Sequence, residues 1–278
     1  MNRRLWLLTL TLLTAVVLMA HPFIDHMNNA ASNEAGQAVA AGALVSIYGA
    51  DFTDELAIAD SIPLARQLLA TKVFFNGIQS PMLFVAPQSD ANPAQINAQL
   101  PWEALQAGVG NAAQVGMVEV IVETVEGRSE PLMAPVADFS PGIFSIQFGV
   151  GQAIAYNALT GIIAAPDGSI PGLLTTPIRH GQFLSILCTG LGAVTPAAET
   201  GNALADGQVR LTDTHPTVLF NDVEVQGVAA LTSEFVGVYQ VNVEITPNIP
   251  VGDAVSLRLK QGDTMSREGV TIAVAPAQ

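Results

Sequence analysis

The segment GVYQVNVEI, residues 237–245, repeats the pattern of an earlier segment, PAQINAQLP, residues 93–101. Each contains a Gln, an aliphatic residue and an Asn in succession, followed three positions later by Leu or Ile. In the later segment Val241 and Val243 alternate with polar residues, which is typical of a β-strand that buries one face. The two segments therefore predict equivalent strands in two related parts of the chain.

Other segments recur in the same order at offsets of 139 to 145 residues. The segment GALVSIYG (42–49) matches GQFLSILCTG (181–190), and VFFNGI (73–78) matches VLFNDV (218–223). Several matches at nearly one offset predict two homologous domains of about 110–140 residues, a usual domain size. The aligned positions include Ser46 with Ser185, Asn76 with Asn221, and Asn97 with Asn242.

Short β-rich segments between turn residues make up most of the chain. This spacing predicts an all-β protein of immunoglobulin-like β-sandwiches. Helical periodicity is scarce, and its best candidate is residues 54–70, which Pro63 interrupts. The expected strands lie in residues 43–49, 72–77, 81–87, 116–127, 181–190, 217–222, 238–245, 254–263 and 269–276.

Prolines and a glycine in APVADFSPGIF, residues 134–144, break the strand pattern and mark the expected join between the domains. The sequence thus predicts two tandem Ig-like sandwiches behind an N-terminal export segment. The expected parts are a signal peptide (1–20), an N-terminal tail (21–40), a first Ig-like domain (41–137) and a second Ig-like domain (138–278).

The first twenty residues have the layout of a secretory signal peptide. Arg3 and Arg4 precede an apolar run of 16 residues from Leu5 to Ala20. A spanning helix needs about 20 such residues. Cleavage after Ala20 predicts an extracytoplasmic protein that is secreted, held at the cell surface or periplasmic. Leu18 at the −3 position is larger than the residue usually preferred there, so an uncleaved N-terminal anchor is the alternative.

The charge of the chain argues against several classes of partner. Its 24 acidic and 10 basic residues give a formal net charge of −14. Such a surface repels the phosphates of nucleic acids and anionic lipid headgroups. We therefore expect no nucleic-acid partner, and no membrane contact beyond a retained N-terminal anchor.

Five individual residues have predicted structural roles. Cys188 is the single cysteine, so it forms no intrachain disulfide and is expected to be a buried thiol. Asn76 and Asn221 precede Gly or Asp between apolar runs, which predicts tight turns with positive φ. Asn97 and Asn242 lie within predicted strands, and we expect their side chains to bridge to loop backbone, with ligand binding as the less favoured alternative.

The sequence assigns no catalytic, cofactor-binding or metal-binding residue, and no cofactor. The sharpest metal hypothesis is a copper site at the N-terminus. After cleavage His21 is the first residue, whose amine and ring nitrogen chelate copper, with His26, His180 or His215 as a second ligand. The favoured alternative is an unstructured tail.

Two further hypotheses rest on few residues. A serine hydrolase needs Ser, His and an acid, and the segment APDGSIPG, which contains Ser169, supplies these residue types together with the nearby His180. The G-x-S-x-G elbow of many hydrolases is absent, so turn chemistry is favoured. Trp102 is a candidate platform for a sugar ring, with burial as the favoured alternative.

An exported acidic chain is also a candidate for calcium binding, which gathers carboxylates at close spacing. Neither of two acidic groups has the compact spacing of a calcium loop, and solvated loop acids are the favoured reading. The two groups are Asp51, Asp54 and Glu55, and Asp213, Asp222 and Glu224.

Taken together, the recurring phrases resemble a bacterial conserved-hypothetical family of tandem IPT/TIG-like, immunoglobulin-type modules found in secreted proteins. The resemblance covers nearly the whole chain after the export segment. It implies a pair of Ig-like sandwiches, an extracytoplasmic location and no catalytic residues. The phrases that carry it are NAAS (29–32), GALVSIYGADF (42–52), VFFNGIQSPMLFVAP (73–87), AQINAQLPW (94–102), FSPGIFS (139–145), GQAIAYN (151–157), LCTGLGAVTP (187–196), FVGVYQVNVEI (235–245) and VTIAVA (270–275).

We therefore expect a non-enzymatic exported protein that serves interaction or assembly. Its expected partner is a protein or glycan at the cell surface, a second copy of the chain in a homo-oligomer included. Sandwich edges and the long loop 158–180 are the expected contact surfaces. The alternatives are an extracytoplasmic copper-binding or hydrolytic enzyme and a glycan-binding module.

Overall fold

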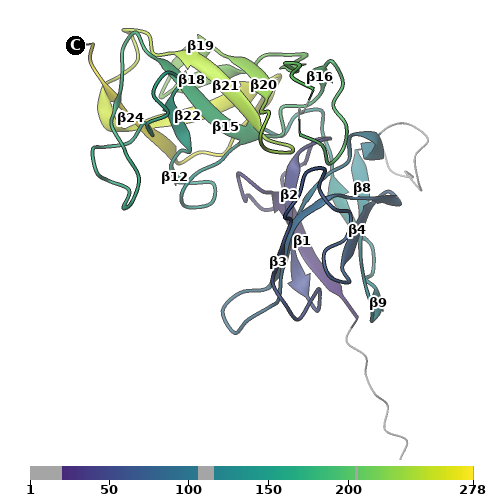
Figure 1. Ribbon diagram of the computed structural model, residues 1–278. Helices are drawn as coiled ribbons and strands as arrows, with labels where there is room; N and C mark the ends of the chain where they lie inside the picture. Colours follow the sequence, from purple (N-terminus) through teal and green to yellow (C-terminus); the bar gives the residue numbers. More distant parts are fainter. Residues whose placement is uncertain (1–20, 106–115, 204–205, 278) are drawn as a thin grey trace, which may run out of the picture.

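The computed structural model describes residues 21–105, 116–203 and 206–277, in which the protein is all-β. Each of the nine expected strand regions contains an observed strand, which confirms the all-β prediction. The described part has one short 3-10 turn, η1 (Trp102–Leu105), and contains no helix long and apolar enough to cross a membrane. The predicted signal peptide, residues 1–20, lies outside the described residues. Figure 1 shows the strands gathered into two bodies along the chain.

The first half forms two five-stranded sheets, with neighbour orders β1-β2-β7-β6-β3 and β10-β8-β4-β5; β9 pairs with β8. Its strands are β1 (Phe23–Asn29), β2 (Leu44–Ala50), β3 (Ala57–Ile58), β4 (Lys72–Phe75), β5 (Ile78–Gln79), β6 (Met82–Ala86), β7 (Ala94–Gln99), β8 (Met117–Thr124), β9 (Gly127–Arg128) and β10 (Leu132–Pro135).

The second half forms two seven-stranded sheets, with main orders β11-β15-β21-β20-β17-β16 and β12-β24-β22-β18-β19. Three short strands pair off these paths: β13 with β15, β14 with β24 and β23 with β22. The strands are β11 (Gly142–Ile143), β12 (Gly151–Gln152), β13 (Ala155–Asn157), β14 (Ile178–Arg179), β15 (Phe183–Thr189), β16 (Val194–Thr195), β17 (Leu211–Thr212), β18 (Thr217–Phe220), β19 (Val223–Gln226), β20 (Val228–Leu231), β21 (Tyr239–Glu244), β22 (Gly252–Gln261), β23 (Thr264–Met265) and β24 (Val270–Ala275).

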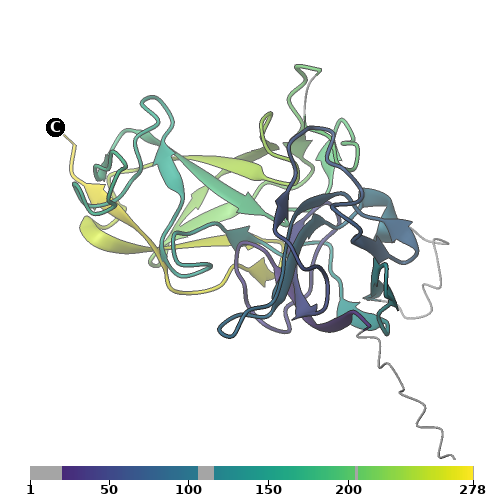
Figure 2. The same ribbon diagram turned by 60° about the horizontal axis from the view of Figure 1, so that its bottom comes forward.

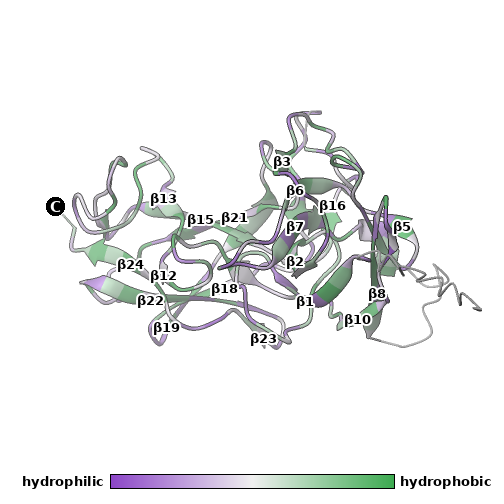
Figure 3. Ribbon diagram, turned by 90° about the horizontal axis from the view of Figure 1, so that it is seen from below, coloured by the Kyte–Doolittle hydropathy of each residue, from purple (hydrophilic) through white to green (hydrophobic). Residues whose placement is uncertain are grey.

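Each half has its own hydrophobic core between its two sheets. The first core takes residues between Ile24 and Val136, and the second takes most of its residues from Ile143 to Val274. Apolar residues colour β24 green in Figure 3, consistent with a strand that buries most of its residues. Strand alternation explains the cores, because every second side chain of a strand points to the same face. The immunoglobulin-like label for each sandwich stays a prediction.

Equivalent strands pair in the same register in the two halves. On β2 and β7, Ser46 lies opposite Asn97, and on β15 and β21, Ser185 lies opposite Asn242. These are the positions that the repeated phrases align in the sequence. A strand slipped by one residue would turn its apolar side chains to solvent, so burial specifies this register.

Asn76 and Asn221 occupy the predicted turns, with φ of 46° and 51°. Each turn also ties back to a neighbouring strand. The side-chain Oδ1 of Asn76 accepts from the N–H of Glu119, and Oδ1 of Asn221 accepts from the N–H of Ser256, both at 2.9 Å. Both asparagines are therefore confirmed as turn residues. Cys188 is fully buried, also as predicted, and burial raises the pKa of its thiol far above the usual range.

The two halves lie next to each other in Figure 2, and hydrogen bonds join them. Thr189 Oγ1 accepts from the N–H of Leu44 at 3.0 Å, and Asn29 Nδ2 donates to the carbonyl of Ser140 at 2.7 Å. The ring of Trp102 packs against the core of the second half and lies over Gly42, leaving no room for a Cβ there. These contacts are buried or half-buried, so they join the halves through more than the linking chain.

Two sequence-based expectations about local structure are wrong. Residues 21–40 are not a simple tail, because β1 (23–29) pairs along β2 and buries Ile24 and Met27. Residues 54–70 are not a helix. They contain β3, which pairs with β6, and several of their apolar side chains are exposed.

Candidate functional site

Alternation along β21 builds the floor of a groove on the outer face of the second half. Tyr239, Val241 and Val243 are buried in the core, so Gln240 and Asn242 point to the opposite face. These two amides are the residues whose repetition marks the sequence.

The outward side chains form a hydrogen-bonded network. Ser185 Oγ donates to Oδ1 of Asn242 at 2.6 Å, and Gln240 Nε2 donates to the same oxygen at 2.9 Å. Tyr156, on β13, donates its hydroxyl to Oε1 of Gln240 at 3.0 Å. The network fixes the orientation of both amides. Among the described residues none accepts from Asn242 Nδ2, so this group keeps donors for a ligand.

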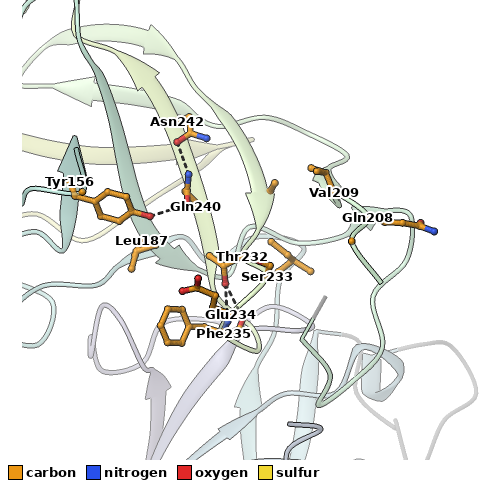
Figure 4. Close-up of a pocket in the computed structure, with 14 residues that line it drawn as sticks. Tyr156, Leu187, Gln208, Val209, Thr232, Ser233, Glu234, Phe235, Gln240 and Asn242 are labelled. Atoms are coloured by element: carbon orange, nitrogen blue, oxygen red, sulfur yellow. Dashed lines mark hydrogen bonds between the residues drawn. The ribbon is translucent and has the colours of Figure 1, made fainter. Parts of the chain in front are cut away.

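A groove of about 800 Å³ lies over this network. Figure 4 shows Tyr156 and Phe235 on one side of the groove and Val209 on the other, with Gln240 and Asn242 above Thr232. Phe235 is 52% exposed and Val209 is 68% exposed. Apolar walls and an ordered amide floor are the usual make-up of a ligand site.

The groove is acidic and has a single carboxylate among its described lining residues, that of Glu234. Burial, and then the nearby charge of Glu234, raise the pKa of the Tyr156 phenol. The phenol therefore stays protonated at neutral pH and can donate to Gln240. No Lys, Arg or His belongs to the described lining of the groove.

The first half repeats the amide network. Ser46 Oγ donates to Oδ1 of Asn97 at 2.9 Å, and Gln95 Nε2 donates to the same oxygen at 2.8 Å. The expected bridge from Asn97 and Asn242 to loop backbone is therefore wrong. The register places a Ser across the ladder from each Asn, within reach of its side chain.

The two outer faces differ in the residues around this network. Tyr156 stands opposite Ser185 in the second half, and Asn28 stands opposite Ser46 in the first. In the first half the ring of Tyr48 stacks with His26, with 4.8 Å between ring centroids. In the first half the aromatic residues beside the amides are therefore Tyr48, across the ladder from Gln95, and Phe84, across from Asn97. The exposed wall formed by Tyr156 and Phe235 belongs to the second half.

The four histidines are not gathered into a metal site. His180 Nε2 lies 2.9 Å from the carbonyl of Ile249, and His215 Nδ1 lies 3.1 Å from Thr212 Oγ1. The described residues hold no group of three His, Cys, Asp or Glu side chains placed to bind a metal ion. His21 lies beside Gly127 in the first half, and His26 is paired with Asp25.

The hydrolase candidates are not assembled either. Ser169 lies in an exposed turn, and its backbone N–H donates a hydrogen bond to the carbonyl of Pro166. Because a carbonyl oxygen only accepts, His180 must donate its Nε2 proton to Ile249, and this nitrogen is not free to act as a base. The pair lacks the nucleophile–base contact of a triad.

The two acidic groups lie at loops. Asp51, Asp54 and Glu55 line an open recess of about 500 Å³, and Asp51 Oδ1 accepts from Gln88 Nε2 at 2.9 Å. Asp213 accepts from Thr195 Oγ1 at 2.6 Å. Neither group places three carboxylates for one cation within the described residues.

Trp102 is half-buried between the halves, so it is not a free sugar platform. Its backbone N–H donates to Thr200 Oγ1 at 3.0 Å. The loop 158–180 does present an exposed surface, as expected of a contact region. Leu159 is 93% exposed and Leu174 is 79% exposed, and Gly161 of the same loop lines the groove.

Sequence reasoning missed the groove because its wall comes from Tyr156 and Phe235, which lie 79 residues apart. Tyr156 lies within the segment GQAIAYN (151–157) and Phe235 begins the segment FVGVYQVNVEI (235–245), but no local pattern predicts that β13 pairs with β15. The signal available was the tyrosine beside Asn157, at the end of GQAIAYN.

No protein-family model and no curated protein matches the chain. Among solved structures it is similar to the surface glycan-binding protein PbSGBP-B from Prevotella bryantii, at 8% identity and a TM-score of 0.26, covering 90% of this chain and 41% of that one. It is also similar to SGBP-B from a complex xyloglucan utilization locus in Bacteroides uniformis, at 12% identity and a TM-score of 0.23, covering 90% and 49%.

A third similar structure is the S-layer protein SbsC, domains 5–6, at 10% identity and a TM-score of 0.27, covering 93% of this chain and 100% of that one. The chain spans less than half of the length of the two glycan-binding proteins. At such low identities and scores these similarities carry no argument about function, which must come from the chain's own residues.

Proposed function

We propose that the protein is a non-enzymatic, exported interaction module and that the groove over β15, β20 and β21 is its binding surface. The observation that carries this proposal is the ordered amide floor of Gln240 and Asn242 beneath a groove of about 800 Å³. Exposed Phe235 supplies apolar area that a ligand would cover. Preformed polar groups in an apolar groove bind ligands without the cost of ordering the site.

We also propose that the two halves are tandem copies of one IPT/TIG-like, immunoglobulin-type module. The support is chemical as well as topological. The Ser–Asn–Gln network recurs with the same donors and acceptors, and so does the turn bond of Asn76 and Asn221. Independent sandwiches have no reason to repeat these bonds at matching strand positions.

Export follows from the N-terminal segment, and we propose that residues 1–20 direct the chain across the inner membrane. The mature protein is then secreted, periplasmic or on the cell surface. Its partner is a glycan or protein there. A second copy of the chain remains a candidate partner, through the sandwich edges.

An enzymatic role has less support from the groove. Most glycoside hydrolases flank the scissile bond with two carboxylates, and the described lining of this groove supplies Glu234 alone. A copper or serine-hydrolase mechanism would need residues that lie at separate places on the molecule, as described for His180 and Ser169.

The proposal is tested by adding labelled protein, residues 21–278, to washed cell envelopes of the producing organism. Phe235→Ala and Gln240→Ala should each reduce envelope binding at least tenfold. Gln95→Ala is the matched control, because Gln95 occupies the equivalent strand position in the first half and should leave binding unchanged. Envelope binding that is equal for all three variants and the parent protein would rule out the groove as the interaction surface.

A further inference from the structure

We infer that the groove of the second half binds a neutral oligosaccharide, with one site per chain. This inference rests on the proposed function and narrows it to one chemical class. Its basis is the combination of amide donors and acceptors on the floor with aromatic rings on the wall, in a groove without a cationic group among its described lining residues.

Charge decides against an anionic ligand. The described lining includes Glu234 and no Lys, Arg or His, and the whole chain carries a formal net charge of −14. A phosphate or carboxylate in the groove would meet this carboxylate with no neighbouring cation to pair with. A ligand rich in hydroxyl groups meets no such penalty.

The sheet itself decides against an added peptide strand. β21 is paired on both sides, by β15 and by β20. The outer edge of β20 is also occupied, because the N–H of Leu231 donates to the carbonyl of Arg210 at 3.0 Å, and β17 pairs with Ala230. A peptide strand binds by pairing with a free backbone edge, and this groove presents a sheet face.

Recognition in the groove must therefore come from side chains. The amides of Gln240 and Asn242 are held in fixed orientations, and Asn242 Nδ2 is open to a ligand oxygen. The rings of Tyr156 and Phe235 lie on the same side of the floor in Figure 4. Sugar rings present hydroxyl edges and apolar C–H faces, which suit an amide floor and an aromatic wall respectively.

The size of the groove indicates a chain of sugars. Its volume of about 800 Å³ is in the upper part of the range of about 300–1,000 Å³ for small-molecule pockets. The first half is expected to lack an equivalent site. Asn28 takes the place of Tyr156 there, and one face of the Tyr48 ring is covered by His26.

The first experiment is affinity electrophoresis of mature protein, residues 21–278, through gels that contain one neutral polysaccharide each: a β-1,4-glucan, a β-1,3-glucan, a mannan or dextran. Polygalacturonate serves as the anionic comparison. We expect retardation by at least one neutral polysaccharide and none by polygalacturonate. Calorimetry with oligosaccharides of the retarding polymer should then give a stoichiometry of one.

Variants assign the binding to the groove. Gln240→Ala and Phe235→Ala should each weaken the measured affinity at least tenfold, while Gln95→Ala should leave it within twofold of the parent protein. Circular dichroism and the unfolding midpoint of each variant confirm that it is folded. Neutral-glycan binding that survives both groove substitutions, or equal retardation by polygalacturonate, would overturn the inference.

Treatment of the envelopes separates failure of this inference from failure of the proposed function. Periodate cleaves sugar rings that carry adjacent free hydroxyl groups, and a β-1,3-glucanase removes the β-1,3-glucans that resist it, so the glycan treatment combines the two. Protease removes protein partners. Groove-dependent envelope binding that periodate abolishes supports the oligosaccharide, even where no polymer of the panel retards the protein. Groove-dependent binding that resists both glycan treatments and is lost after protease would support the interaction function and rule out the oligosaccharide.

Discussion

Asn76 and Asn221 stabilise their turns in two ways. Each adopts a positive φ, which costs most side chains about 1–2 kcal/mol and costs Asn less. Each also accepts a backbone N–H from the adjacent strand, at Glu119 or Ser256. A single residue thus sets the turn conformation and joins it to the sheet.

Asn221→Ala should lower the free energy of unfolding by about 1–2 kcal/mol, because it loses the bond to Ser256 and strains the turn. Asn221→Gly also removes the hydrogen bond to Ser256, but glycine adopts the positive φ without strain. Its decrease in the free energy of unfolding should therefore be smaller. Urea titrations give both values. Asp222→Ala, at the exposed neighbour, is the control, and an equal loss there would contradict the role of Asn221.

Burial makes the thiol of Cys188 unreactive. Its thiol is fully buried, and desolvation raises its pKa far above the usual range, so the reactive thiolate is absent at pH 8. A thiol-specific chromogenic disulfide at pH 8 should label the native protein at least a hundredfold more slowly than protein unfolded in guanidinium. Rapid stoichiometric labelling of native protein would show that the thiol is accessible.

At the scale of elements, β1 has a larger role than its place near the N-terminus suggests. It covers an edge of β2, buries Ile24 and Met27, and ends at Asn29, which reaches across to Ser140 of the second half. Removing it would expose a strand edge and a wall of the first core.

Deletion of residues 21–29 should therefore destabilise the protein strongly, by more than about 3 kcal/mol. Burial of one large apolar side chain contributes about 1.5–3 kcal/mol, and two are lost. Deletion of the exposed His21 alone is the matched control. Thermal unfolding followed by circular dichroism distinguishes the two, and equal midpoints would mean that β1 is dispensable.

The segment 54–70 shows why the helical pattern misled. Its apolar residues have helical spacing, but only Leu68 among them is buried, whereas Leu56 and Ile58 are exposed. The backbone instead pairs with β6, and the N–H of Ala59 donates to the carbonyl of Leu83 at 2.8 Å. Pairing with a neighbouring sheet overrode a weak local preference.

At the scale of the whole molecule, the junction couples the two cores. Thr189 Oγ1 donates to the carbonyl of Gly237 at 2.7 Å within the second half and accepts from Leu44 of the first half. Trp102 extends from η1 of the first half onto the second core. Buried contacts of this kind favour unfolding of the halves as one unit.

Scanning calorimetry of the parent protein should give one transition. Thr189→Val should remove the acceptor of the buried Leu44 N–H, lower the unfolding free energy by about 1–3 kcal/mol and split or broaden the transition. Thr217→Val, partly exposed on β18, is the control. Two well-separated transitions in the parent protein would mean that the halves are independent.

By itself the sequence determined the all-β class, most strand positions and the two turn asparagines, because alternation and turn chemistry are local. The sequence also indicated Gln240 and Asn242, because both recur in the repeated segments, but it did not indicate the residues of the groove around them. Only the tertiary structure placed β1 in a sheet, seated Trp102 between the halves and brought Tyr156 and Phe235 to one groove. Those features arise where segments far apart in the sequence pack together. The burial that stabilises them does not produce a hydrophobic periodicity within either segment, so no local pattern predicts them.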